Sequence, residues 1–478
     1  MPEKNARTWN SMIGACIQHG HSDEAMQTFY GMQLEGIHVT DVTVIVVLGA
    51  CTSDQHLDFG KRIQKRVSEG NHAQPATALQ NSLVNMYAKC GCLEAAKKSF
   101  DEMEQDTRSV VSWNAMISAY IQNSRDVEAL ELYKQMCQAA EPDSFTFSSV
   151  LTACSNLNAL EEGKLVHHQV EATGMELDGV LGSALITMYG KCEDSGSARL
   201  VFEKLVEEQR TSMDVVCWNA MISAYSQCGC SSEAFELFYK MDLEGIKQVS
   251  ASFVSILAAC NSFDKGMALE LRLASAGLDT SQEIGAALIN MHSRCGNLDR
   301  ARRVFDSMVR INDVRALRNP ICWTAMLAAY SHHGCARQSL ELLFLMSLEG
   351  VQPNEINFTS ILNACSHAGL SSQAWTSFLD MHTKYGVAPA AQHLVCLSDM
   401  LGRAGMLGEA EAFIGTSTYD DTSTEAEFAA VAWKSLLNAC KLQGNAGAGA
   451  RVAEKLAELE PEVSAPYILL AGIYAAQT

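Results

Sequence analysis

Cysteine is the residue type with which this chain could most readily do chemistry, because seventeen are present. Two close pairs, within Cys90–Cys92 and Cys228–Cys230, offer thiolates of the kind that bind zinc. A tetrahedral zinc site needs a second pair at a suitable spacing, and neither pair has one. The cysteines recur inside apolar patterns, so we interpret them as reduced, packed thiols and predict no metal site and no cofactor.

Catalytic motifs do not stand out elsewhere in the chain. A zinc-dependent deaminase needs H-x-E and C-x-x-C motifs to hold the metal and to place a glutamate, and the sequence contains neither. No glycine-rich phosphate loop and no hydrolase triad motif stands out. We therefore predict that the chain is not an enzyme and takes no small-molecule substrate.

Short polar side chains at a fixed spacing are the other candidates for function. Asn10, Asn114, Asn219 and Thr324 each follow a tryptophan and stand 104, 105 and 105 residues apart. Amides and hydroxyls carry hydrogen-bond donors and acceptors. Side chains that recur at a long, constant interval line an extended surface in repeat proteins, so a binding function is favoured.

The elements that must position these residues follow from three repeated markers. The tryptophans open WNSMIGAC, WNAMISAY, WNAMISAY and WTAMLAAY; the second marker, LGAC, LTAC, LAAC and LNAC, ends at Cys51, Cys154, Cys260 and Cys365; the third, NMYAKCG, TMYGKCE, NMHSRCG and DMLGRAG, begins at Asn85, Thr187, Asn290 and Asp399. Together they divide each period into thirds of roughly 35 residues, which is the size of one helix-turn-helix unit.

Each third has the pattern of two helices. From Trp113 to Tyr120, apolar side chains fall at i, i+3, i+4 and i+7, which predicts one helix. Asn123 and Ser124 interrupt it, and Asp126 is expected to cap a second helix. No third shows the alternation of a strand. The sequence therefore predicts an all-α, right-handed α-solenoid of about thirteen helix-turn-helix repeats.

Glycine and proline mark the turns of this pattern. Six glycines are expected to adopt a left-handed conformation between paired helices: Gly20, Gly91, Gly229, Gly296, Gly334 and Gly405. The prolines are expected at the unit boundaries, where they do not interrupt a helix: Pro2, Pro75, Pro142, Pro320, Pro353, Pro389, Pro461 and Pro466.

The overall charge argues against a nonspecific binder of polyanions. The formal net charge is −20 and the pI is about 5.1, whereas such binders present a basic surface. The longest apolar stretch, at 42–51, is too short to span a bilayer, so no membrane partner is predicted. No secretory signal or transit peptide is recognisable.

Three alternating motif types, WNxMI, TFxxVLxAC and ALxxMYxKCG, closely resemble the pentatricopeptide repeat family, in particular its plant-type PLS subclass. The phrases FDEM, LEG and ACSHAGL strengthen the resemblance, which covers residues 6–429. The chain after Ala429 resembles the E-type extension of that subclass. The resemblance implies a remnant of a preceding short repeat at 1–5, a repeat array at 6–429 and a truncated E-type extension at 430–478, all within a longer protein.

Members of this family bind single-stranded RNA with one base per repeat. The resemblance assigns base choice to the fifth residue of each motif, counting the tryptophan as the fourth, and to the last residue. It implies that the pair Asn114/Asp143 reads uracil, Asn81/Ser109 cytosine, Thr324/Asn354 adenine and Ser183/Asp214 guanine. Three pairs depart from the family pattern and leave their bases open: Asn10/Thr40, Asn219/Val249 and Ala286/Asn319. Asparagine at position five nevertheless leans to a pyrimidine. In the last short motif, Val395 at position five departs from the pattern altogether.

By the same resemblance, the second residue of each motif is apolar and sandwiches a base: Val111, Phe145, Val180, Val216, Ile321 and Ile356. Ala78 and Ala251 are smaller, and Arg7, Glu283 and Gln392 depart from the pattern. Phosphate contacts are expected from the cations that lie eight residues after position five, about 80° away around the helix: Lys89, Lys191, Arg294 and Arg403. An acidic chain would thus present a locally basic stripe.

Each assignment has a structural alternative. An asparagine after tryptophan is also an ordinary polar residue early in a helix. Asp143 and Asn354 follow proline turns and would serve as caps, and Lys89 and its equivalents would interact with helix dipoles. The alternative function is a tetratricopeptide-like protein-binding scaffold, but that fold favours glycine at position eight, where this chain has Ile13, Ile117, Ile222 and Leu327. A degenerate member that no longer binds RNA is a third hypothesis.

The resemblance therefore implies a sequence-specific single-stranded RNA binder of a mitochondrion or chloroplast, which specifies a site for C-to-U editing or for RNA processing. A deaminase or another editing factor would act in trans or in a missing C-terminal portion. Stacking supplies roughly 1–3 kcal/mol per base, so four good sites supply about 4–12 kcal/mol before ordering costs. A nanomolar complex needs about 12 kcal/mol net, so modest affinity is expected.

Overall fold

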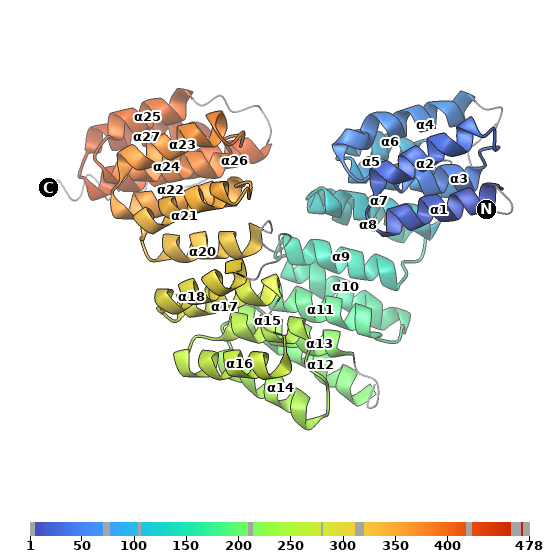
Figure 1. Ribbon diagram of the computed structural model, residues 1–478, viewed down its shortest axis with the longest axis horizontal. Coiled ribbons are helices and arrows are strands. Elements are labelled where there is room, and N and C mark those ends of the chain that lie inside the picture. The colour runs from blue at the N-terminus through green and yellow to red at the C-terminus, as the bar shows by residue number, and fades with distance from the viewer. Residues whose placement is uncertain are drawn as a thin grey trace. The chain divides into compact units, whose positions relative to one another are not determined.

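The structure is a computed structural model that describes residues 5–69, 77–103, 107–208, 214–278, 281–310, 320–416, 423–459 and 470–471. The chain divides into two compact units, Met1–Gln248 (unit 1) and Val249–Thr478 (unit 2). Figure 1 shows helices and no strand in the described residues of either unit. The predicted all-α class is confirmed.

Unit 1 contains seven described helix pairs: α1 (Ala6–Gln18) with α2 (Ser22–Leu34), α3 (Asp41–Leu48) with α4 (Leu57–Glu69), α5 (Thr77–Lys89) with α6 (Leu93–Asp101), α7 (Val110–Gln122) with α8 (Asp126–Ala139), α9 (Ser144–Asn156) with α10 (Leu160–Thr173), α11 (Gly179–Lys191) with α12 (Ser195–Glu208), and α13 (Val215–Gln227) with α14 (Ser231–Leu243). A short 3-10 turn, Asp54–His56, precedes α4.

Unit 2 contains six described pairs: α15 (Ser250–Ala259) with α16 (Phe263–Ala276), α17 (Gln282–Arg294) with α18 (Leu298–Arg310), α20 (Pro320–His332) with α21 (Ala336–Leu348), α22 (Glu355–Ala368) with α23 (Ser371–Thr383), α24 (Ala391–Arg403) with α25 (Leu407–Thr416), and α26 (Ser423–Leu442) with α27 (Ala446–Leu459). The thirteen pairs of the described chain confirm the predicted number of repeats. The predicted boundary at Ala429 lies inside α26.

The first helix of each pair is called its A helix and the second its B helix. Within each unit, every A helix packs against the next A helix, and most B helices pack between their own A helix and the following one. This is the stacking of a solenoid, in which each repeat buries the apolar face of its neighbour. The A helices therefore form one continuous layer in each unit, and the surface along that layer is called the A-helix face.

Aromatic side chains connect successive repeats in the core. Trp113 of α7 lies edge-on to Phe100 of α6, with ring centroids 5.2 Å apart. The same contact recurs between Phe202 and Trp218, at 5.0 Å, and in unit 2 between Phe305 and Trp323, at 4.9 Å. Such pairs contribute about 0.5–1.5 kcal/mol beyond the area they bury. The tryptophans are thus core residues that fix the position of the asparagine or threonine that follows.

The turns follow the predicted glycines. Gly20, Gly91, Gly229, Gly296, Gly334 and Gly405 all have φ between 65° and 83°, as predicted for left-handed caps. At the equivalent turns without glycine, Ser124 and Glu193 adopt the same conformation, with φ of 57° and 60°. Among the prolines, Pro142, Pro353 and Pro389 lie between helices and Pro320 begins α20, as predicted; Pro2, Pro75, Pro461 and Pro466 lie outside the described residues.

The prediction that Asp126 caps α8 is wrong. The N-cap is Arg125, whose side chain makes no capping hydrogen bond, and Asp126 is the first residue of the helix. Its buried carboxylate accepts a hydrogen bond from Asn156 Nδ2 at 3.1 Å, at the end of α9. A contact with the next repeat, which no local pattern indicates, therefore occupies this side chain.

Candidate nucleic-acid interface

The predicted last-position residues begin the A helices. Thr40, Ser109, Asp143, Asp214 and Asn354 are the N-caps of α3, α7, α9, α13 and α22, and each side chain accepts a hydrogen bond from a backbone N–H of the first helical turn. The structural alternative for Asp143 and Asn354, a helix cap, is therefore confirmed as local geometry, and Thr40, Ser109 and Asp214 share that geometry. It does not exclude recognition, because a cap oxygen has lone pairs left at the A-helix face.

Each position-five residue lies about one turn into its A helix, near the N-cap of the next A helix. Asn81 and Asn114 are only 8% and 6% exposed, although both are polar. Asn10 lines a shallow, open surface recess of about 420 Å³ together with Arg7, Thr40 and Val42, so positions two and five of one repeat meet the cap of the next. This places the two predicted base-choosing positions beside each other.

Asn114 and Asp143 are in direct contact. Asn114 Nδ2 donates to Asp143 Oδ1 at 3.0 Å, and Asp143 Oδ1 also accepts the N–H of Thr146 at 2.8 Å. The Thr146 hydroxyl lies 2.7 Å from Asn114 Oδ1 and 2.8 Å from Asp143 Oδ1. Burial raises the pKa of Asp143, but the hydrogen bonds from Thr146 and Asn114 outweigh it and hold the pKa below its usual value. The carboxylate is therefore ionised at neutral pH.

Thr324 and Asn354 are joined through a third residue. Asn357 Nδ2 donates to Thr324 Oγ1 at 2.8 Å, while Asn357 Oδ1 accepts the backbone N–H of Asn354 at 2.9 Å. Asn354 Oδ1 in turn accepts the N–H of Asn357 at 3.1 Å. The predicted adenine pair is thus part of a reciprocal cap at the start of α22.

Three position-five asparagines have an unsatisfied oxygen. The Oδ1 atoms of Asn10, Asn81 and Asn219 are buried and accept no hydrogen bond. An unpaired buried acceptor costs about 1–3 kcal/mol, so native proteins rarely keep one without a reason. A donor at the A-helix face would satisfy these atoms once the amide turns its buried oxygen outward.

Ser183 and Asp214 have no hydrogen bond to each other among the contacts of the described residues. The Ser183 hydroxyl donates to Val180 O in its own helix at 2.9 Å, and Asp214 accepts the N–H of Val216 at 3.2 Å. Ser183 instead lines a cavity of about 310 Å³ with Val180 and Lys191, so three predicted site residues share one recess. Of the pair Ala286/Asn319, Ala286 is buried and Asn319 lies outside the described residues.

The predicted base-sandwiching residues are exposed apolar side chains on the first turns of the A helices. Their exposed fractions lie between 41% and 67%: Val111, Phe145, Val180, Val216, Ile321 and Ile356. Val42 of α3 shares this exposure, although it was not predicted. Because the stripes of larger apolar residues in the same helices are buried, this exposure is selective.

The four predicted phosphate-binding cations are all exposed at the ends of A helices. Lys191 Nζ lies 3.4 Å from Asn156 Oδ1. Arg294 donates to Leu257 O at 2.6 Å, which is an interaction with the carbonyl end of the previous A helix. Arg403 pairs with Asp399 at 2.8 Å, so its charge is partly neutralised. For Arg294 the helix-dipole alternative therefore describes the geometry.

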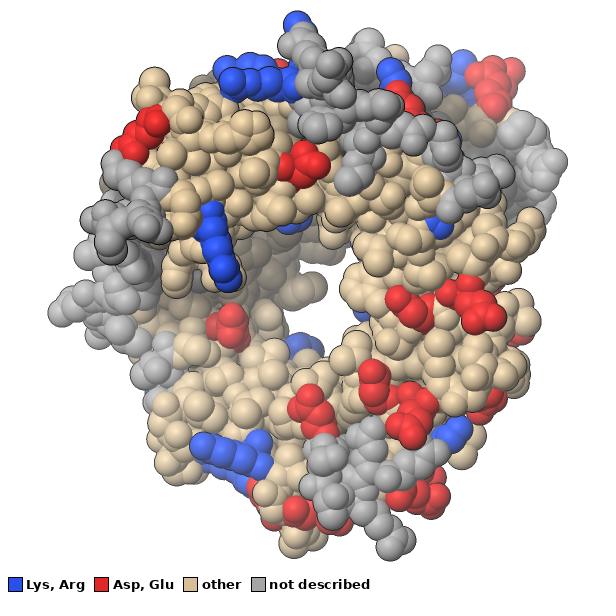
Figure 2. Space-filling model, turned by 90° about the vertical axis from the view of Figure 1, so that its right-hand side faces the viewer, with Lys and Arg blue, Asp and Glu red and all other residues tan. Residues whose placement is uncertain are grey.

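No continuous basic patch appears on the face that Figure 2 draws, as far as the described residues go; Lys and Arg side chains are scattered among Asp and Glu. All seventeen cysteines are free thiols. Burial raises the pKa of several, to about 12 for Cys51 and Cys154 and to about 11 for Cys217. Within the described ranges, no group of His, Cys, Asp and Glu side chains is placed to hold a metal ion. None of the helices in these ranges has the length and hydropathy of a membrane span.

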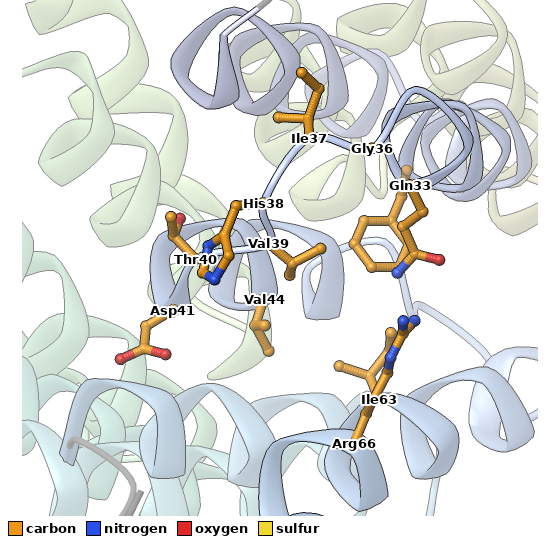
Figure 3. Close-up of a pocket in the computed structure, with 11 residues that line it drawn as sticks. Gln33, Gly36, Ile37, His38, Val39, Thr40, Asp41, Val44, Ile63 and Arg66 are labelled. Atoms are coloured by element: carbon orange, nitrogen blue, oxygen red, sulfur yellow. The ribbon is translucent and has the colours of Figure 1, made fainter. Parts of the chain in front are cut away.

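Another cavity, of about 410 Å³, lies beside Thr40 beneath the loop from Gly36 to Thr40. Figure 3 shows Thr40 and Asp41 on one side of it and Arg66 on the other. Its lining comes from α2, α3 and α4 and includes neither Asn10 nor Val42. It is therefore a recess behind the cap of α3 and is distinct from the surface recess that Asn10 lines.

Sequence reasoning missed the third residue of the A helices. Thr43, Ser112, Thr146, Ser252 and Asn357 occupy this position and are all completely buried, although they are polar. A detectable signal existed, because a polar residue three positions after a Ser, Thr, Asp or Asn is typical of a capping box. The contacts of Thr146 and Asn357 with the previous repeat could not be detected in that way.

Comparison with known proteins places the chain in a family. The family model described as "PPR repeat" matches residues 7–37, 81–107, 216–246, 287–312 and 321–351, and "PPR repeat family" matches residues 108–156. Among solved structures, the pentatricopeptide repeat protein PPR10 in complex with an 18-nt psaJ RNA element aligns with the whole chain and 73% of its own chain, at 15% identity and a TM-score of 0.46.

Curated relatives from Arabidopsis thaliana align along nearly the whole chain. A mitochondrial pentatricopeptide repeat-containing protein is 33% identical over 100% of this chain and 70% of its own length. A chloroplastic one is 34% identical over 99% of this chain, which spans only 54% of that relative. A putative mitochondrial one is 35% identical over 97% of this chain and 71% of its own length. With thirteen helix pairs in its described residues and this similarity to several such proteins, the chain belongs to the pentatricopeptide repeat family.

Proposed function

We propose that the chain binds single-stranded RNA along its A-helix face and that each suitable repeat recognises one unpaired base. The observation that carries the proposal is the hydrogen bond between Asn114 and Asp143, at a boundary where the two successive A helices carry the exposed side chains of Val111 and Phe145. Two apolar side chains at successive repeats can sandwich a base, while a polar pair between them meets its edge. The family to which the curated relatives belong reads single-stranded RNA with one base per repeat, which supports the proposal.

The polar pair at this boundary suits uracil. Asp143 Oδ1 is occupied by Thr146 and Asn114, so its Oδ2 is the acceptor left for a ligand. Asn114 Nδ2 has a second proton to donate, since only one is used on Asp143. Uracil has a donor at N3 with a carbonyl acceptor on each side. Its N3–H would donate to Asp143 Oδ2 while one carbonyl accepts from Asn114 Nδ2. The assignments of cytosine to Asn81/Ser109, adenine to Thr324/Asn354 and guanine to Ser183/Asp214 belong to the same proposal.

The acidic charge of the chain is compatible with modest RNA affinity. Stacking and edge recognition act at short range, whereas net charge acts mainly on nonspecific attraction. Lys89 and Lys191 would contact phosphates directly, and Arg403 would do so after exchange of its Asp399 partner. Each phosphate contact adds to the salt dependence of binding rather than to base choice.

The biological role that we propose is to specify a site for C-to-U editing or for processing of an organellar transcript. Residues 6–429 would be a PLS-type array and residues 430–478 part of an E-type extension, to which a deaminase or other editing factor would bind in trans. Relatives named as mitochondrial and chloroplastic support an organellar location without choosing between the two. The pair of α26 and α27 packs on α24 and would extend the array toward that partner.

A titration with short RNAs tests the binding proposal. Counted by repeat order, the four assigned pairs predict the pattern C-U-N-G-N-N-N-A, in one of the two strand directions. The 478-residue chain should bind an oligonucleotide that carries this pattern in one direction more tightly than one in which C, U, G and A are each exchanged. Equal binding of both directions and of all exchanged RNAs, or no binding, would overturn the proposal. Duplex RNA of the same sequence is the control, because paired bases cannot enter the sites.

A further inference from the structure

We propose that Thr146 and Asn357, at the third position of their A helices, are further determinants of base choice. Each is a positioning residue that decides which hydrogen-bonding group of the preceding repeat's position-five side chain is directed to the base. The inference rests on the proposed function and adds a buried residue to the two positions that the resemblance assigns. It depends on the side-chain contacts across two repeat boundaries, one in each unit.

The first contact fixes the amide of Asn114. Its Nδ2 lies 3.0 Å from Asp143 Oδ1, so a flipped amide would place its own oxygen against an ionised carboxylate. Two facing acceptors repel each other, which leaves Oδ1 on the side of Thr146. The hydroxyl of Thr146, which is completely buried, lies 2.7 Å from that oxygen. The orientation of the amide is therefore set by Asp143 and completed by Thr146.

The single proton of the Thr146 hydroxyl has one favourable destination. Asp143 Oδ1 already accepts the N–H of Thr146 and the amide of Asn114. Asn114 Oδ1 would have no partner if the hydroxyl donated to Asp143 instead, and a buried unpaired acceptor is costly. The proton is therefore donated to Asn114 Oδ1, and this oxygen is held inside the protein rather than offered to a base.

The predicted cytosine pair shows the opposite arrangement. Ser112 occupies the position equivalent to Thr146, but its hydroxyl lies 3.2 Å from Ser109 Oγ, and Asn81 Oδ1 has no partner. No neighbour holds Asn81 Oδ1, so this amide can turn its buried oxygen to the A-helix face and accept from a donor such as the amino group of cytosine, whereas Asn114 Oδ1 is held by Thr146. Uracil has no amino group. The third position thus distinguishes two asparagines that are identical at position five.

The second contact directs a hydroxyl proton. Asn357 Oδ1 accepts the N–H of Asn354, which turns its Nδ2 toward Thr324 Oγ1 at 2.8 Å. Because Thr324 accepts there, its own proton is free to be donated elsewhere. At the A-helix face it would meet an acceptor such as N1 of adenine. Guanine carries a proton at N1 and does not match.

Replacement of Asn357 by aspartate reverses this direction. Asn357→Asp keeps the oxygen that accepts from Asn354 and replaces the donor with an acceptor of the same shape. Thr324 must then donate inward and offers only a lone pair to the base. We expect the preference for adenine over guanine at this base to fall about tenfold in a titration of the 478-residue chain. An unchanged ratio with intact binding would overturn the inference.

The matched experiment at the other boundary uses Thr146→Val, which removes the hydroxyl and keeps the shape. Without the Thr146 hydroxyl, Asn114 Oδ1 is a buried acceptor with no partner, and only the bond to Asp143 still holds the amide inward. Turning this oxygen to the A-helix face then becomes favourable when a base offers a donor there, so we expect the preference for uracil over cytosine to fall about tenfold. Thr146→Ser should keep the wild-type ratio. Thr43→Val is the control, because Thr43 makes the same cap with Thr40 while Asn10 Oδ1 has no partner.

The outcomes separate this inference from the proposed function. If the wild-type chain shows no base preference at these positions, the proposed function fails before any variant is compared. If the wild type prefers uracil and adenine but the variants keep both ratios, only the inference fails. A variant that has lost structure is recognised by its circular dichroism spectrum, by its melting temperature and by a changed ratio at the Ser183/Asp214 base. A change confined to the adjacent base supports the inference.

Discussion

The amide of Asn114 donates a hydrogen bond to the carboxylate of Asp143 across the boundary between two repeats, with Nδ2 and Oδ1 3.0 Å apart. The two residues are 29 positions apart and lie on successive A helices. One residue is almost fully buried and the other begins a helix. This single contact joins helix capping, repeat stacking and the proposed recognition of a base, and each of these can be tested separately.

Exchange of both residues should change the recognised base. In the double variant Asn114→Thr with Asp143→Asn, the pair becomes the one found at Thr324/Asn354. We expect preference at that base to move from uracil toward adenine, with the bases at other repeats unchanged. Adding Thr146→Asn, which supplies the donor that Asn357 supplies to Thr324, should complete the change. The measurement is a set of Kd values for RNAs that differ only at that nucleotide. An unchanged preference, with binding intact, would contradict the assignment of base choice to these positions.

The cap at Asp143 predicts a pH-dependent contribution to stability. The pKa of Asp143 is held below its ordinary value, near 3.9, so the contribution is fully present above about pH 4 and is lost as pH falls through the lower folded pKa. At pH 7, Asp143→Ala should lower the free energy of unfolding by about 1 kcal/mol. The difference from wild type should shrink between pH 4 and pH 2. Urea titrations at fixed pH measure it, and a constant difference across this range would refute it.

Exposed and buried apolar residues of one helix should behave differently. Val216 is 50% exposed on α13 and Ile222 is completely buried. Val216→Ala should change the free energy of unfolding by less than about 0.5 kcal/mol but weaken RNA binding, whereas Ile222→Ala should cost about 2–5 kcal/mol of stability. Melting curves and RNA titrations on both variants check this. Equal loss of stability in the two would show that Val216 is a core residue.

Lys191 should contribute to the salt dependence of binding. Removing one phosphate contact to a single strand reduces the slope of log K against log salt by about 0.7. We expect this for Lys191→Gln and a smaller effect for Arg403→Gln, because Arg403 is paired with Asp399. Lys98→Gln is the control, since Lys98 lies on a B helix and pairs with Glu102. A slope unaffected by Lys191→Gln would remove this residue from the interface.

The left-handed turn at Glu193 should be a weak point of the array. Glu193 has φ of 60°, where a side chain is strained, whereas Gly91 occupies the same kind of turn without strain. Glu193→Gly should therefore raise the free energy of unfolding by about 1 kcal/mol, and Gly91→Ala should lower it by a similar amount. Differential scanning calorimetry compares them. A lower melting temperature for Glu193→Gly would mean that the side chain contributes more than the backbone costs.

Much of the fold was predictable because the period is written in local patterns. The stripe of Trp113 to Tyr120 predicted an A helix, and the glycines predicted the left-handed turns, since both depend on residues within one or two helical turns of each other. The family followed from motif order, and the comparisons confirm it. The capping role of Asp126 was predicted wrongly, because Asn156 of the next repeat competes for its carboxylate.

The sequence alone determined that this protein is a stack of helical hairpins with polar residues at two recurring positions, because periodicity and capping are local properties of the chain. Only the tertiary structure decided what each polar residue contacts. Asn81 and Asn114 are the same residue at the same motif position, yet one has an unpaired buried oxygen and the other is held by Asp143 and Thr146. The reason is physical: these partners come from the next repeat, about 30 residues away, and reach the amide only when two helices pack side by side.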